Sequence, residues 1–277
     1  MGPSAIRYAG LSERLGRIGV IARDLGNVRT FTAEAVAVQD DSARFLPEIL
    51  DTAARIATLV REAVDRGSMP LVLGGDHSVA LGTLAGLADA AGRPGGAVWI
   101  DAHGDLNTPA SSPTGNVHGM PLAAVLGRCG EAFAHDGVMI PSLDPARVVL
   151  VGVRSLDEAE RAYLRDSEIR AYTMSDVDRI GIERVMRDAL ARAAGPGFVH
   201  VSLDLDVLDP EIAPGVGTPV PGGLTYREAH LACELIAESS VVRSLEVVEA
   251  NPILDRENRT ALTAVELLAS ALGQTIL

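Results

Sequence analysis

The chain contains no lysine, so all 24 of its Lys and Arg residues are arginine. A protein without lysine cannot form a lysine Schiff base with a carbonyl substrate or with pyridoxal phosphate, and it cannot contain a Walker-type phosphate loop. No Gly-x-Gly-x-x-Gly motif follows a predicted strand, which disfavours a dinucleotide-binding enzyme. Several large classes of cofactor chemistry are therefore excluded or disfavoured.

Cysteine is also scarce. Cys129 and Cys233 are the only two, and they lie far apart in the sequence. We expect them to be small core residues of a protein in a reducing compartment, the cytoplasm, rather than a disulfide or a metal-binding pair. There is no charged-then-apolar leader and no apolar run of about 18 residues, so we expect no membrane partner.

The charge balance is acidic, with a net charge of −13 at pH 7. This disfavours nucleic acid as a partner and suits a small cationic substrate. The 277 residues are 47% hydrophobic, which is enough for one large core. No linker-like segment divides the chain, so we expect a single domain spanning residues 1–277.

Six short apolar runs, rich in β-branched residues, predict strands. Their hydrophobicity is continuous rather than alternating, which is typical of strands covered on both faces. Helical spacing of apolar residues between them predicts helices over 49–64, 78–91, 182–190 and 225–239. The sequence therefore predicts an α/β fold with a central, mainly parallel sheet and helices on both faces. The predicted strands are 71–73, 97–100, 148–151, 171–174, 199–203 and 241–248.

Acidic and imidazole side chains follow these runs, where ligands bind in open parallel sheets. Residues two apart in an extended chain point the same way, so Asp101, His103 and Asp105 aim at one place. Asp204 and Asp206 do the same after another run, and His77 follows a third. Such a cluster needs cations between its carboxylates. Oxygen and imidazole donors suit Mn²⁺, and six ligands suit two ions about 3.5–4 Å apart.

The same segments resemble the binuclear manganese site of the ureohydrolases, and further segments resemble the arginase family, with most likeness to its bacterial type. The likeness extends from Met1 to the C-terminus. The ureohydrolase-like segments are 74–78 (GGDHS), 101–107 (DAHGDLN) and 202–206 (SLDLD), and the arginase-like segments are 114–121, 217–228 and 249–261.

The resemblance implies hydrolysis of L-arginine to L-ornithine and urea, by a hydroxide that bridges two Mn²⁺ per subunit. Asp101 and Asp204 would be the bridging ligands. The implied catalytic residues are His118, as a proton shuttle, Glu228, as the acid that pairs with the substrate guanidinium, and Asp105. The full set of implied metal ligands is His77, Asp101, His103, Asp105, Asp204 and Asp206.

The resemblance also implies the substrate contacts. The α-carboxylate would be bound by residues of the 107–118 loop, and the α-amino group by Asp157 and Glu160. Val207 stands where the family more often has glycine or alanine, so we expect crowding near the second ion. The implied substrate-binding residues are Asn107, Ser112, Thr114, Asn116, Asp157, Glu160 and Thr218.

Several alternatives stay open at this point. A related amidinohydrolase would act on agmatine or guanidinobutyrate, and a non-catalytic homologue would act as a binding or regulatory subunit. The family also implies a homo-oligomer, a trimer or hexamer, that binds arginine and other small guanidino compounds. Finally, the family usually has a strand ahead of the segment matched by residues 1–7, and the run near 17–22 supplies only one strand. We therefore expect the native chain to start upstream of Met1.

Overall fold

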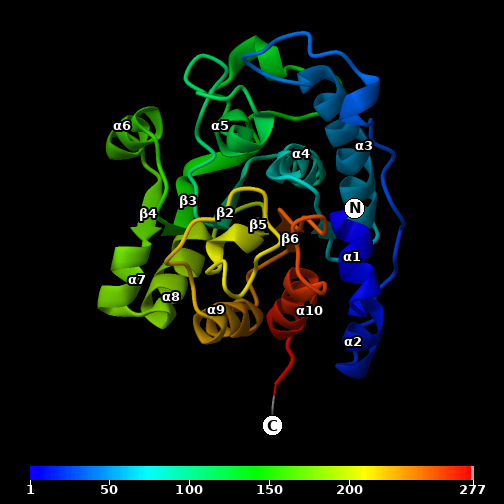
Figure 1. Cartoon of the computed structure of the whole chain (residues 1–277), viewed down its shortest axis with the longest axis vertical. Helices are drawn as coiled ribbons and strands as arrows, with labels where there is room; N and C mark the ends of the chain where they lie inside the picture. Colours follow the sequence, from blue (N-terminus) through cyan, green and yellow to red (C-terminus); the bar gives the residue numbers. More distant parts are fainter. Residues whose placement is uncertain (276–277) are drawn as a thin grey trace.

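A computed structural model describes residues 1–275 of the chain and contains one six-stranded sheet (Figure 1). Its strands are β1 (Leu71–Leu73), β2 (Gly95–Ile100), β3 (Leu143–Val153), β4 (Arg170–Thr173), β5 (Val199–Asp204) and β6 (Ser244–Val248). They lie in the order β1-β6-β5-β2-β3-β4, and every pair is parallel. The predicted parallel α/β fold is confirmed.

Helices cover both faces of the sheet (Figure 1), which explains the continuous hydrophobicity of its strands. On β2, for example, Val98 and Ile100 pack on one side and Ala97 and Trp99 on the other. No helix among the described residues is long and apolar enough to cross a membrane. The helices are α1 (Gly2–Tyr8), α2 (Leu11–Arg17), α3 (Leu46–Asp65), α4 (Ala80–Ala91), α5 (Pro121–Val125), α6 (Glu158–Asp166), α7 (Met174–Ile180), α8 (Ile182–Ala193), α9 (Tyr226–Ser239) and α10 (Arg259–Ala271).

Different helices cover the two faces of the sheet. Helices α4 and α5 pack on one face with α3 against α4, and α8, α9 and α10 pack on the other. Gly82 and Gly86 let α3 and α4 approach closely, because a Cβ at either position would lie 2.5 Å from the carbonyl oxygen of Ala53 or Ala57. This contact fixes α4, and therefore the turn before it that carries His77, over the end of the sheet.

Several predicted boundaries need correction, and the largest difference is in β3, which spans Leu143–Val153 rather than 148–151. Strand β6 begins at Ser244 rather than at residue 241. Met174 opens α7 instead of ending a strand, because Thr173 and Asp176 form a capping box there. The helix predicted over 78–91 begins at Ala80, after a short 3₁₀ turn at His77–Val79.

The strand predicted near residues 17–22 is wrong. Helix α2 ends at Arg17, and the backbone N–H groups of residues 18–20 donate back to the carbonyls of Leu15 and Gly16. A backbone engaged in closing a helix has no donors left for a strand ladder. Ile18 and Val20 still pack partly against the core.

Candidate metal centre

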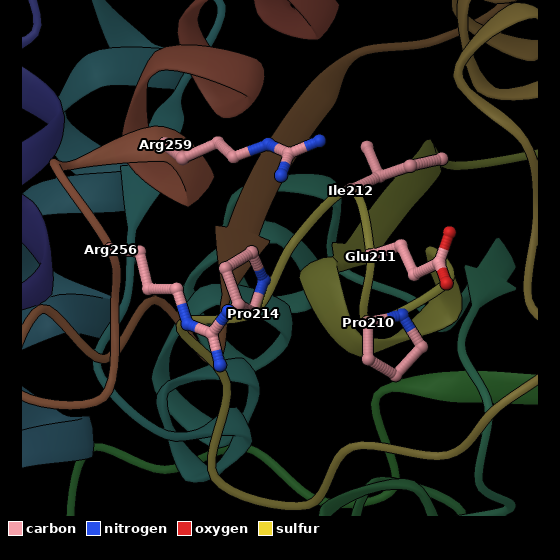
Figure 2. Close-up of a pocket in the computed structure, with 6 residues that line it drawn as sticks. All are labelled: Pro210, Glu211, Ile212, Pro214, Arg256 and Arg259. Carbon is pink, nitrogen blue, oxygen red and sulfur yellow. The ribbon is translucent and has the colours of Figure 1, made fainter.

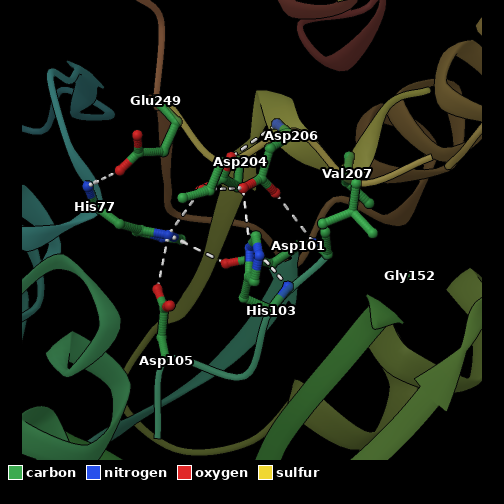
Figure 3. A network of polar contacts seen from close by, with 12 residues as sticks. His77, Asp101, His103, Asp105, Gly152, Asp204, Asp206, Val207 and Glu249 are labelled. Atoms are coloured by element: carbon green, nitrogen blue, oxygen red, sulfur yellow. Dashed lines mark hydrogen bonds and ion pairs between the residues drawn. The ribbon is translucent and has the colours of Figure 1, made fainter. Parts of the chain in front are cut away.

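His77 lies at the centre of a group of buried carboxylates (Figure 3). It follows β1, on the turn that Asp76 caps by accepting a hydrogen bond from the Ser78 N–H. Its Nδ1 lies 3.2 Å from Asp101 Oδ2, 2.9 Å from Asp105 Oδ2 and 3.0 Å from Asp204 Oδ2. The ends of β1, β2 and β5 therefore bring these side chains to one point.

His103 forms a second group next to the first. Its Nδ1 lies 3.0 Å from Asp206 Oδ2 and 3.5 Å from Asp101 Oδ1. The potential metal-ligand atoms form two groups of three. One group is His77, Asp101 and Asp204, and the other is Asp101, His103 and Asp206, so Asp101 belongs to both. All six predicted metal-ligand residues thus meet at the carboxyl edge of the sheet, as two adjoining sites.

The chemistry of this donor set fits divalent cations. His77 Nδ1 and Asp105 Oδ2 are buried and only 2.9 Å apart, but neither makes a hydrogen bond of good geometry within the described residues. Burial, with the charge of Asp101, raises the pKa of Asp105 to about 7, and burial raises the pKa of Asp204 well above its ordinary range. Carboxylates in such a place disfavour their own ionisation unless positive charge lies between them. The residues present therefore fit bound divalent metal ions.

Trp99, which sequence reasoning missed, holds two of these residues. Its ring stacks on His77 at a centroid distance of 4.2 Å and an interplanar angle of 8°. Its Nε1–H also donates to Asp101 Oδ2 over 3.0 Å. The sequence did indicate this contact, because Trp99 and Asp101 are two residues apart and side chains at that spacing lie on the same side of an extended chain.

Glu249 is a second residue without a role in the sequence-based assignment, although it too follows a predicted strand. Its Oε1 accepts the backbone N–H of His77 over 2.9 Å and lies 3.2 Å from His118 Nδ1. It directly follows β6, as Asp101 follows β2, so the rule that found the metal ligands also pointed to it. Glu249 and His118 therefore place an acid and an imidazole beside the candidate metal ligands.

Glu228 lies elsewhere, and its contacts do not support its sequence-based role. Its Oε2 accepts hydrogen bonds from the N–H and Oγ1–H of Thr225, over 2.8 and 2.7 Å, in the capping box of α9. No contact in the described part of the chain joins it to a metal-ligand candidate. The carboxylate is held by the start of its own helix, whereas Glu249 lies beside His77 and His118.

The two residues predicted for the α-amino group of the substrate, Asp157 and Glu160, are connected to Asn107, which was predicted for the α-carboxylate. Asn107 Nδ2 donates to Asp157 Oδ2 over 2.6 Å. Asp157 and Glu160 form the capping box of α6, and Glu160 Oε1 accepts the Leu106 N–H over 3.1 Å. The loop after the metal ligands of β2 is therefore tied to the start of α6. Their contact with a substrate stays a prediction.

The other predicted substrate-binding residues lie in two places. Within the loop, Ser112 Oγ accepts the Gly115 N–H, and Thr114 Oγ1 accepts the N–H of Asn116. Thr218 lies on a different segment, and its Oγ1 donates to Asp206 Oδ2 over 3.2 Å. The hydroxyls of the loop thus support turns, whereas Thr218 directly contacts a candidate metal ligand.

Val207 packs over a glycine (Figure 3). A Cβ at Gly152, whose φ is +94°, would lie 2.5 Å from Val207 Cγ2. Val207 was expected to crowd this region. Its side chain is fully buried in the core, and glycine at position 152 leaves the space that it occupies.

A surface pocket of about 400 Å³ lies on another part of the chain (Figure 2). None of its lining residues is a metal-ligand candidate, so this pocket is not the candidate centre. They are Pro210, Glu211, Ile212, Pro214, Arg256 and Arg259.

The hydrogen bond to Glu249 raises the pKa of His118 from 6.5 to about 9, against the opposing effect of burial. A raised folded-state pKa means that protonated His118 stabilises the fold below pH 6.5, and that this contribution is lost as the pH rises through about 9. In metal-free protein, we expect the free energy of unfolding to fall over this interval more steeply than in His118→Asn. Urea unfolding of both proteins in EDTA measures this difference, and parallel pH profiles would contradict the pairing.

Comparison with known proteins agrees with this geometry. A model of the arginase family matches residues 1–273. Arginase from Bacillus caldovelox is 51% identical over 282 residues, covering 100% of this chain and 93% of that protein. Its solved structure matches with a TM-score of 0.95 over the same shares of the two chains. Arginase from Bacillus subtilis is 47% identical, also covering 100% of this chain and 93% of that protein. Agmatine ureohydrolase of Thermoplasma volcanium is 25% identical with a TM-score of 0.64, covering 82% of this chain and 68% of that one. The chain belongs to the arginase family.

Proposed function

We propose that this chain is a manganese-dependent arginase, which hydrolyses L-arginine to L-ornithine and urea. The observation that carries the proposal is the meeting of two buried ligand groups, sharing Asp101, with Glu249 and His118 beside them. The arginases named above support arginine as the substrate.

The proposed cofactors are two Mn²⁺ ions. Four carboxylates and two imidazoles without a thiolate are donors suited to Mn²⁺ rather than to structural zinc, and four aspartates balance two divalent charges. When bound, two such ions supply a hydroxide nucleophile near neutral pH and stabilise negative charge on the reacting group. The proposed ligands are His77, Asp101, His103, Asp105, Asp204 and Asp206.

Glu249 and His118 supply what the substrate still needs. A guanidinium group carries a positive charge, and the buried Glu249 carboxylate can pair with it in a place of low dielectric constant. Ornithine leaves as an amine, so the nitrogen that joins it to the guanidinium carbon must be protonated when that bond breaks. The hydrogen bond with Glu249 favours the protonated imidazole of His118, which is the form that can donate this proton.

Recognition of the amino-acid end is assigned to the 107–118 loop and to the start of α6. Asn107, Ser112, Thr114 and Asn116 are proposed for the α-carboxylate side, and Asp157 with Glu160 for the α-amino side. The hydrogen bond between Asn107 and Asp157 supports this assignment, because it places the two groups of residues next to each other. Thr218 would act beside Asp206.

Urea release from L-arginine, compared with agmatine, tests the proposed function. Agmatine lacks the α-carboxylate, and a site built to bind a charged group rejects an analogue without it by roughly 10⁴-fold when its partners are left buried and unpaired. We expect Mn²⁺-loaded protein to prefer arginine strongly, and Asn107→Ala to lose much of this preference.

Two outcomes would favour the alternatives. Comparable specificity constants for arginine and agmatine would indicate a general amidinohydrolase. Mn²⁺ binding without urea release from either substrate would indicate a non-catalytic homologue.

We also propose a cytoplasmic homo-oligomer, a trimer or hexamer as the family resemblance implies. Both cysteines are free, which suits a reducing compartment. Ile253, Leu254 and Leu262 are exposed apolar side chains, and apolar side chains that gather on a surface are typical of faces that contact another protein.

A further inference from the structure

Two polar side chains, of Ser202 and Glu246, lie inside the sheet next to the candidate metal centre. Ser202 on β5 and Glu246 on β6 are direct partners in the parallel ladder, and both are fully buried. Trp99 on β2 pairs with Ser202, and Val72 on β1 pairs with Glu246. A carboxylate among such neighbours loses its hydration, so its position calls for a compensating interaction.

Ser202 connects Glu246 to His77. His77 Nε2 lies 2.7 Å from Ser202 Oγ, and Ser202 Oγ lies 2.8 Å from Glu246 Oε1. A carboxylate can only accept, so the Ser202 hydroxyl donates to Glu246. The oxygen of the same hydroxyl is then left to accept, and the His77 Nε2–H must be its donor.

This direction decides which nitrogen of His77 is free to bind a metal ion. With the proton on Nε2, the neutral ring has its lone pair on Nδ1, and Nδ1 is the atom that faces Asp101, Asp105 and Asp204. Metal-binding histidines commonly have their second nitrogen held in this way by a carboxylate or carbonyl.

His200 contributes to the same buried group. It is fully buried, and its Nε2 lies 3.3 Å from Glu246 Oε1. Glu246 Oε1 thus lies against both Ser202 Oγ and His200 Nε2, and the Thr83 side chain also interacts with this carboxylate. The Ser202 hydroxyl is the group that connects the carboxylate to His77.

We propose that Glu246 is a positioning residue that acts through Ser202 to hold His77 as an Nδ1 metal ligand. The inference rests on the proposed metal centre but not on the identity of the substrate. Glu246 does not itself reach the ligand groups, so its effect is on how well His77 is prepared to bind.

Glu246→Gln is the most informative variant. Glutamine has nearly the size of glutamate, but it no longer forces the Ser202 hydroxyl to be the donor in their hydrogen bond. An amide can accept from Ser202 through its oxygen or donate to it through its nitrogen, so both tautomers of His77 become available. Ser202→Ala breaks the same connection from the other side. Ser244→Ala is the control, since Ser244 is equally buried on β6, pairs with His200, and has no partner for its hydroxyl in the described structure.

The measurement is the affinity of each metal-free protein for Mn²⁺, by equilibrium dialysis with metal analysis, together with circular dichroism to show that the fold is kept. We expect Glu246→Gln and Ser202→Ala to bind Mn²⁺ at least about 10-fold more weakly, and Ser244→Ala to bind as the parent does. The Mn²⁺ activation curve of Glu246→Gln should move to higher concentration by the same factor and reach a plateau near that of the parent.

Folded Glu246→Gln and Ser202→Ala proteins with parent affinity for Mn²⁺ would overturn the inference. A lowered plateau with unchanged Mn²⁺ affinity would overturn it too, because Glu246 would then act in turnover. If the parent protein itself bound no Mn²⁺, the proposed metal centre would fail, which is a different result from failure of the Glu246 inference alone.

Discussion

An Asp204→Asn protein is expected to bind less than its full complement of Mn²⁺, and its arginine turnover should be lower by on the order of 10³-fold or more. Asp204 Oδ2 lies 3.0 Å from His77 Nδ1, and Oδ1 accepts the Asp206 N–H over 2.8 Å. Asparagine keeps the volume and can still accept that N–H, so the turn at Leu205–Val207 should form. What is lost is a negative charge in the ligand group that contains His77.

Metal-free Asp204→Asn should be at least as stable as the metal-free parent. Burial and the charges of Asp206 and Asp101 raise the pKa of Asp204, so its ionised form is disfavoured in the empty fold. A neutral amide removes this cost, whereas it also removes the stabilisation that bound Mn²⁺ provides. The thermal midpoint of the variant should therefore not rise on adding Mn²⁺, although that of the parent should.

Asp209→Asn is the matched control for this prediction. Asp209 lies on the same segment, but its Oδ2 accepts the Gly222 N–H, and its backbone contacts lower its pKa. We expect the control to keep both its Mn²⁺ content and its thermal response to Mn²⁺. Metal analysis of the purified proteins gives the answer, and an Asp204→Asn protein with two bound ions and normal turnover would remove Asp204 from the ligand set.

Glu249→Gln should cost activity on the order of 10²–10³-fold, whereas Glu228→Gln should change it little. Glu249 lies beside His77 and His118, and an uncharged amide there cannot neutralise a guanidinium group. Glutamine at position 228 still serves in the capping box of α9, so we expect a loss of unfolding free energy below about 1 kcal/mol.

Steady-state kinetics with arginine, and urea unfolding of both variants, separate these two carboxylates. The pair serves as its own control, because each variant exchanges one glutamate for glutamine. An inactive, normally folded Glu228→Gln together with an active Glu249→Gln would restore the original assignment of Glu228 and remove Glu249 from the site.

The sequence by itself determined the layers of the fold and the six metal-ligand candidates. Both follow from local patterns. Strands covered on both faces are continuously apolar, and polar residues directly after a strand lie at the end of the sheet, so Asp101, His103 and Asp105 could be grouped without knowing the strand order, although the chain bends between them. The parallel arrangement then requires the carboxyl ends of the strands to meet at one edge.

Local patterns were insufficient where two explanations share one motif. Thr225 and Glu228 fit both a helix cap and a catalytic segment, and only the fold shows that the carboxylate is used by its own helix. The run at 17–22 is apolar enough for a strand, but its backbone donors are used in closing α2.

Tertiary structure alone decided which residues support the site. Glu249 meets His77 across 172 positions of sequence, and Ser202 meets Glu246 only because β5 and β6 are neighbours in the sheet. Strand order depends on how the helices pack over the two faces, which is a property of the whole chain and leaves no mark in a short window of sequence. The metal ligands could therefore be read from the sequence, whereas the groups that hold and assist them depend on the folded chain.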